Sequence, residues 1–108
     1  MNYTYIRLDN KQTLFQKVPM YNKNNIEQTC IVKTLDSYNH VIWAFCDIPS
    51  GFRFGRTFKT LKEARAFIGS AYYMQYINKL RSIRINSEHY KKLVEQRITF
   101  LKRMNGQL

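Results

Sequence analysis

The sequence has few acidic residues, few cysteines and no long apolar run. Its 108 residues include only seven Asp and Glu, two Cys and two Pro. No apolar run approaches the roughly 18 residues that a membrane-spanning helix needs, and the first residues do not combine a positive segment with an apolar one, as an export signal does. We therefore expect a cytoplasmic protein without a membrane partner, whose thiols stay reduced.

Motifs typical of enzymes and metal sites are also missing. The acidic residues are scattered singly, no His or Cys has the spacing of a zinc ligand set, and no glycine run precedes a Lys-Ser or Lys-Thr pair. Carboxylate catalysis, zinc binding and phosphate loops each need such patterns, because their groups must converge on one atom or ion. We therefore predict a protein that is not an enzyme and uses neither a metal nor another cofactor.

The apolar and aromatic residues present are sufficient for a single domain spanning residues 1–108. The chain is 44% hydrophobic and contains seven Phe, eight Tyr and one Trp, a composition unlike that of a disordered tail. Period-two patterns and turn residues predict strands, mainly within residues 1–58. The expected strands are 3–8, 14–18, 28–35, 40–48 and 52–59, with a turn at 9–11 and a polar loop at 21–25.

A hairpin around Asp36–Asn39 is the clearest of these features. Cys30 and Cys46 are equidistant from Tyr38 in the sequence, so a turn at that residue places the two thiols opposite each other. In the strand that follows, the period of two separates an aromatic face, which should be buried, from a polar one. The aromatic face carries Phe52, Phe54 and Phe58, and the polar face carries Arg53, Thr57 and Lys59.

From residue 61 the pattern is helical, with mainly two helices within 61–104. Thr60 and Glu63 match a capping box, which predicts a helix from Leu61 to about Leu80, with a bend or a close contact at Gly69. Residues 81–86 are predicted as a connector, and Ser87 as the cap of a helix over about 88–104. The first helix should cover the sheet with Ala64, Phe67, Ile68, Ala71 and Met74, and place Tyr73 and Tyr76 near its other side. We therefore expect an α+β domain, a small antiparallel sheet of three to five strands followed by two amphipathic helices.

Basic residues are concentrated in the second half of the chain. Residues 1–50 contain five basic and four acidic side chains, whereas residues 51–108 contain thirteen basic and three acidic ones. Nearly all of the formal net charge of +11 therefore lies after residue 50. Such asymmetry favours a polyanionic partner, either nucleic acid or an acidic protein face. A solvated face without a partner is the alternative that charge alone leaves open.

The candidate binding residues are basic and aromatic side chains between Phe52 and Arg84. Long cationic side chains neutralise phosphates and release counterions, and tyrosines offer stacking surface to unpaired bases. The alternative interpretation is a solvated helix face with half-buried tyrosines. The candidate nucleic-acid-binding residues are Arg53, Arg56, Lys59, Lys62, Arg65, Tyr73, Tyr76, Lys79, Arg81 and Arg84.

Residues 40–69 contain a strand, a turn with Gly51, a second strand ending in Arg56-Thr57-Phe58, and the capped helix start at Thr60. This order resembles the arm-site DNA-binding module of phage-type integrases, a three-stranded sheet followed by a helix. In that family the sheet is laid into the major groove, so the resemblance implies DNA contacts from the strand before the helix. The long amino-terminal section and the second helix depart from the module. The implied contact residues are Arg53, Arg56, Thr57 and Lys59.

We therefore predict a small nucleic-acid-binding protein, regulatory or accessory, of a kind that phages and mobile elements encode, and we favour DNA over RNA. The alternative is a protein-interaction inhibitor of the phage counter-defence type, which binds an acidic or nucleic-acid-handling host protein. Both functions use the same cations, and a homodimer is compatible with either.

Overall fold

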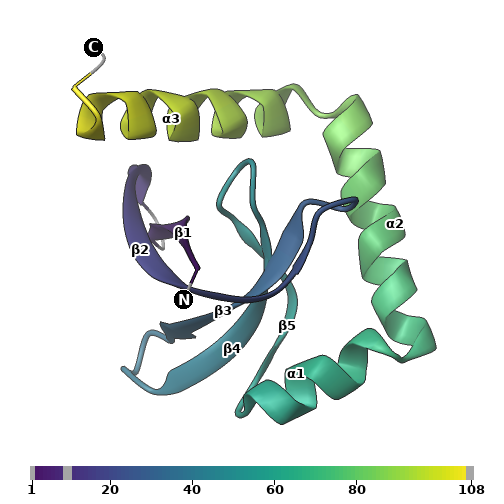
Figure 1. The fold of residues 1–108 in the computed structure, drawn as a ribbon. Helices are drawn as coiled ribbons and strands as arrows, with labels where there is room; N and C mark the ends of the chain where they lie inside the picture. Colours follow the sequence, from purple (N-terminus) through teal and green to yellow (C-terminus); the bar gives the residue numbers. More distant parts are fainter. Residues whose placement is uncertain (1, 9–10, 107–108) are drawn as a thin grey trace.

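The computed structural model describes residues 2–8 and 11–106, with their side chains except those of 11–13. Five strands form one antiparallel sheet in sequence order, and three helices follow and surround it in an arc (Figure 1). This confirms the α+β class, with three helices in place of the expected two. Residues 9 and 10 of the predicted turn lie outside the described residues. The elements are β1 (Tyr3–Leu8), β2 (Lys11–Asn24), β3 (Thr29–Leu35), β4 (Val41–Asp47), β5 (Arg53–Phe58), α1 (Leu61–Ile68), α2 (Ala71–Asn86) and α3 (Glu88–Met104).

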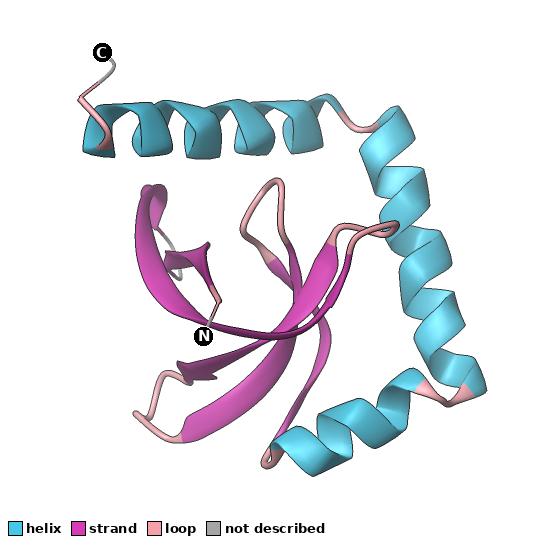
Figure 2. Ribbon diagram, viewed as in Figure 1, coloured by secondary structure: helices cyan, strands magenta, loops and turns pink. Residues whose placement is uncertain are grey.

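β2 is longer than predicted, because it takes part in two strand pairs. Up to Pro19 it pairs with β1, and from Met20 onward it pairs with β3. The expected loop at 21–25 is therefore wrong for residues 21–24, since β2 continues to Asn24. Figure 2 shows β2 as a strongly bent strand, and this bend curls the whole sheet.

Both faces of the curled sheet are buried at its centre. Alternate residues of β3 and β4 face opposite sides, as the period of two requires. Small side chains fill the inner side, and larger ones face the helices, so β3 is apolar on both sides rather than amphipathic. The first cluster contains Ile6, Val18, Cys30, Val32, Ala44 and Cys46, and the second contains Ile31, Phe45, Phe58 and Ala64.

The predicted hairpin between β3 and β4 is confirmed. Cys30 pairs directly with Cys46, and both are buried free cysteines. In the turn, the Asp36 carboxylate accepts hydrogen bonds from the backbone N–H groups of Tyr38 and His40 at 2.8 and 3.0 Å. This local bonding is typical of Asp at the start of a turn.

The aromatic face of β5 packs as expected, except at its start. Phe54 and Phe58 both contact the ring of Phe45, at centroid distances of 5.9 and 5.4 Å. Phe52 precedes β5 and instead contacts Tyr90 of α3 at 6.2 Å. The aromatic side of β5 therefore faces α1 and α2, while Phe52 joins the sheet to α3.

The helical region breaks at residues 69–70, where a bend within one helix was expected. The capping box is confirmed at the start of α1, because the Thr60 hydroxyl accepts the Glu63 N–H at 3.1 Å. Gly69 caps the end of α1 and Ser70 precedes α2, which then runs to Asn86. The predicted connector at 81–86 is therefore wrong, since it forms the last turns of α2. The predicted helix 88–104 is confirmed as α3, with the Ser87 hydroxyl accepting the Tyr90 N–H at 3.2 Å.

The break changes which residues of α2 face the sheet. Ile77 and Leu80 are buried, and Tyr73 packs with Phe45 at a centroid distance of 5.1 Å. Ala71 and Met74, both expected on the sheet side, are exposed, Met74 by 47%. The prediction was wrong because it carried the 100° step per residue through one continuous helix.

Candidate nucleic-acid interface

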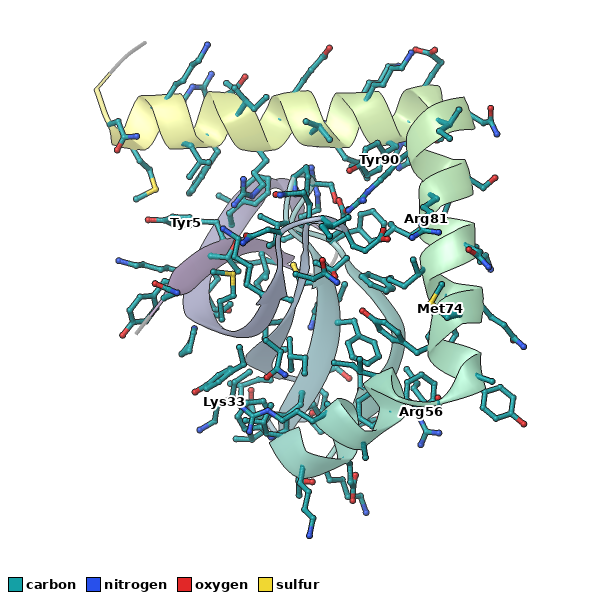
Figure 3. All side chains as sticks on the ribbon, turned by 45° about the vertical axis from the view of Figure 1, so that its right-hand side comes forward. Tyr5, Lys33, Arg56, Met74, Arg81 and Tyr90 are labelled. Atoms are coloured by element: carbon teal, nitrogen blue, oxygen red, sulfur yellow. The ribbon has the colours of Figure 1, made fainter. Side chains whose placement is uncertain are left out.

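The candidate residues occupy three different environments. One group is exposed around α1, a pair lines a hollow between β5 and α2, and the others pack or pair within the fold. We call the first group the α1 basic surface, and Figure 3 shows one of its members, Arg56, at the corner where α1 meets α2. The α1 basic surface consists of Arg56, Lys59, Lys62 and Arg65, all of them exposed.

Two of these cations are positioned by contacts with the fold. The Arg56 guanidinium lies over the rings of Phe58 and Phe67, at 5.1 and 5.7 Å from their centroids. The Arg65 Nε donates a hydrogen bond of 2.8 Å to Asn22 of β2. Side chains held in this way lose less conformational freedom when they bind an anion. The α1 basic surface is therefore partly preorganised.

No ion pair neutralises the α1 basic surface within residues 2–8 and 11–106. Glu63, the acid on α1, accepts the backbone N–H of Lys59 at 3.4 Å as part of the helix cap. Lys59 and Lys62 stand at the amino-terminal end of α1, where a positive charge opposes the helix dipole. Helix stability therefore does not account for these two lysines.

Arg53 and Lys79 line a second feature, a hollow between β5 and α2. Its volume is about 260 Å³, and its lining is mostly apolar. The full lining is Phe52, Arg53, Phe54, Gly55, Tyr76, Lys79, Leu80 and Ile83.

Gly55 lies in the wall of this hollow, where β5 and α2 come so close that a side chain does not fit. It has a φ of +73°, and a Cβ at this position would lie 3.0 Å from the Tyr76 ring. The pairing of β4 with β5 shifts here, since Ala44 pairs with Thr57 but Phe45 pairs with Phe54. Gly55 and Arg56 therefore form a bulge, a feature that redirects side chains at a sheet edge.

Tyr73 and Tyr76 face the core rather than solvent. The Tyr76 ring stacks on Phe67 at a centroid distance of 5.5 Å, and both tyrosines belong to the aromatic cluster under α1 and α2. Tyr73 thus contributes to packing, and Tyr76 does so while also lining the hollow. Tyr72, which sequence reasoning did not select, is the exposed tyrosine of α2, at 65%.

Arg81 and Arg84 pair with carboxylates from the sheet region. Arg81 binds Glu27, and this hydrogen bond lowers the pKa of the Glu27 carboxyl. Arg84 binds Asp47, which is fully buried and also accepts from the Tyr90 hydroxyl at 3.0 Å. Burial opposes the charge of Arg84, but the hydrogen bond with Asp47 raises its pKa overall. Both arginines thus hold α2 against the sheet, a role different from the predicted phosphate contact.

Sequence reasoning missed two further arginines with internal roles. The Arg7 Nε donates to the carbonyl of Ser50 at 2.9 Å, and its Nη1 donates to the Gln96 side chain at 3.1 Å. The Arg97 Nε donates to the carbonyl of Tyr5 at 3.2 Å. Arg7 could have been recognised from the sequence, because it is a single charged residue within the apolar run of β1. With Arg84 they form a set that we call the interior arginines.

Among the described residues, no group of three or more His, Cys, Asp or Glu is arranged to hold a metal ion. In the same part of the chain, no helix has the length and apolar character required to cross a membrane. The buried Asp47 accepts hydrogen bonds from its own partners, the backbone N–H of Ser50 and the Tyr90 hydroxyl.

Comparison of the chain with protein-family models, curated proteins and solved structures finds no match. Functional inference therefore rests on the residues and their geometry.

Proposed function

We propose that this protein binds nucleic acid through the α1 basic surface. The main support is that all four cations of this surface are exposed and form no ion pair among the described residues. They are Arg56, Lys59, Lys62 and Arg65. Guanidinium and ammonium groups bind phosphate oxygens and release counterions from the polyanion. The function is thus electrostatic attachment to a sugar–phosphate backbone.

The proposed contact involves α1 and β5, the last strand of the sheet. Both faces of the central strands are buried, as the clusters around Val32 and Phe45 indicate. The resemblance to the integrase module implies that a sheet face is laid into the major groove. Such a contact would need one face of the central strands to be exposed. An edge strand followed by a short helix, by contrast, leaves Arg56 and Lys59 accessible.

The test is a salt series with a labelled DNA duplex. Four phosphate contacts predict that affinity falls on the order of a hundredfold between about 50 and 200 mM salt. The variant Lys59→Glu/Lys62→Glu/Arg65→Glu should lose most of the affinity. Its matched control is Lys92→Glu/Lys102→Glu/Arg103→Glu on α3, which changes the net charge equally at exposed positions far from α1. Equal losses in both variants, or no binding by the native protein, would refute the proposal.

The second candidate function is binding to an acidic protein. It is favoured by Met74 and Ile85, which are 47% and 75% exposed and share one stripe of α2 with Arg81. A helix stripe of this kind suits a protein partner more than a phosphate backbone. This candidate predicts a discrete complex that survives nuclease treatment and is lost in the variant Met74→Glu/Ile85→Glu.

A further inference from the structure

The hollow between β5 and α2 is a concave site outside the α1 basic surface. Three aromatic residues, Phe52, Phe54 and Tyr76, line it together with aliphatic side chains. Arg53 of β5 and Lys79 of α2 add cations to the lining, and Arg56 directly follows the lining residue Gly55 in the sequence. The site thus combines an aromatic interior with positive charge at its border.

We propose that this hollow receives one unpaired nucleobase, with the phosphate of that nucleotide bound by Lys79 and the next phosphate by Arg56. This inference rests on the proposed function and specifies it, because it makes a single strand the preferred form of nucleic acid. Bases have a π-face that stacks on aromatic side chains irrespective of sequence. A base in a duplex is already stacked and paired, so it cannot enter the hollow without being flipped out.

The size and lining of the hollow fit this occupant. Its volume of about 260 Å³ is slightly below the roughly 300–1,000 Å³ typical of pockets for larger organic ligands. One ring system therefore fills it. An aliphatic chain would leave Lys79 without a counter-charge, and an acidic side chain would leave the aromatic lining without a stacking partner. A base joined to a phosphate satisfies both parts of the site.

The position of the hollow also fits a continuous strand. Along β5 and just past its end, the chain passes from Gly55 to Arg56 and then to Lys59. A bound single strand of nucleic acid can therefore continue from the hollow to the α1 basic surface. On α2, residues 72, 76, 79 and 83 share one stripe at helical spacing. Exposed Tyr72 therefore extends the aromatic lining along α2 beyond Tyr76.

The experiment compares binding of three labelled probes by fluorescence anisotropy at one salt concentration. The probes are a 12-nucleotide oligothymidine strand, a sugar–phosphate strand of equal length without bases, and a 12-base-pair duplex. The native protein should bind the base-bearing strand about tenfold more tightly than the strand without bases, since stacking of one base supplies that factor. Equal affinity for these two strands would overturn the inference.

Two variants locate the effect in the hollow. Ile83→Trp fills the space and should remove the preference for bases while leaving the affinity for the baseless strand unchanged. The matched control is Ile98→Trp, at a position of α3 that is 45% exposed. If Ile83→Trp does not fold by circular dichroism, Lys79→Glu tests the phosphate contact and should weaken binding of the base-bearing strand more than Lys102→Glu does. A preference for bases that persists in folded Ile83→Trp, or a Lys79→Glu variant that binds no more weakly than Lys102→Glu, would overturn the inference.

A final arm uses thymidine monophosphate followed by NMR. Binding that Ile83→Trp abolishes supports the hollow as a nucleotide site even if no strand binds, in which case only the proposed function fails. Strand binding that depends on the α1 basic surface but not on the hollow variants retains the proposed function and overturns this inference. No binding of any probe overturns both.

Discussion

The interior arginines and the α1 basic surface carry the same charge in opposite environments. Arg7, Arg84 and Arg97 donate hydrogen bonds to carbonyls and polar side chains inside the fold. The cations around α1 extend into solvent, and none of them pairs with a carboxylate among the described residues. The formal charge of +11 therefore overstates the charge available to a ligand. Whether a cation faces the interior or the solvent side of its element decides whether it stabilises the fold or remains accessible.

The largest effect is expected from Asp47, which pairs with Arg84, one of the interior arginines. Asp47→Ala leaves the Arg84 guanidinium partly buried without its counter-charge, so the free energy of unfolding should fall by about 3–5 kcal/mol. The comparison is Glu27→Gln, which breaks the more exposed pair with Arg81 and should cost less than about 1 kcal/mol. Urea unfolding measures both. Similar losses would mean that the interior pair is no more important than the surface pair.

A substitution at Gly55 tests whether close packing also determines the structure where β5 meets α2. In Gly55→Ala the new methyl group meets the Tyr76 ring and the backbone stays at positive φ, so stability should fall by about 1–3 kcal/mol. Gly69→Ala is the matched control, because Gly69 has a φ of −78° and a Cβ there would meet the Ala66 carbonyl oxygen at an ordinary contact distance of 3.7 Å. It should leave the melting temperature unchanged or raise it slightly. A tolerant Gly55 would contradict the close contact between β5 and α2.

A smaller effect, of opposite sign, is expected on the α1 basic surface. Lys62→Glu places a negative charge at the start of α1 and should raise the free energy of unfolding by about 0.3–1 kcal/mol. Lys102→Glu, in the last turn of α3, should lower it by a similar amount, because the dipole has the opposite sign there. Thermal melts at low salt compare the two. A destabilised Lys62→Glu would show that this lysine serves the fold, as the interior arginines do.

An effect confined to alkaline pH concerns Tyr90. Burial, followed by the nearby charge of Asp47, raises the pKa of the Tyr90 hydroxyl to about 12. A pKa raised in the folded state contributes stability that is present below the unfolded pKa of about 10. That contribution is lost as pH rises from about 10 through 12. Tyr90→Phe should therefore weaken the decline of stability over this range, as urea unfolding at successive pH values would reveal.

Sequence patterns predicted the elements whose signals are local. The capping box at Thr60, the Ser87 cap and the turn after Asp36 each depend on bonds within a few residues, and all three are present. β2 was predicted too short, because its second half is stabilised by pairing with β3 rather than by its own polar residues. The helix break at Gly69 was underestimated for a similar reason, since packing of Tyr73 on Phe45 favours the turned α2.

The candidate site shows the same limit. Spacing and charge selected Lys59, Lys62 and Arg65, which are exposed as expected. They also selected Arg84, whose partner Asp47 lies 37 residues away in sequence. Local sequence contains no information on such a partner. The hollow was missed altogether, because its walls come from β5 and α2 and its shape depends on the bulge at Gly55.

The bonds of Arg7 have a consequence for how the chain reaches its folded state. Each strand pairs with the preceding one, so successive hairpins can assemble while the chain is being synthesised. The guanidinium of Arg7, however, finds acceptors at Leu93 and Gln96, which are made 86 and 89 residues later. The first strand is thus completed by the last helix, and amide protons of β1 and α3 should exchange with solvent as one cooperative unit.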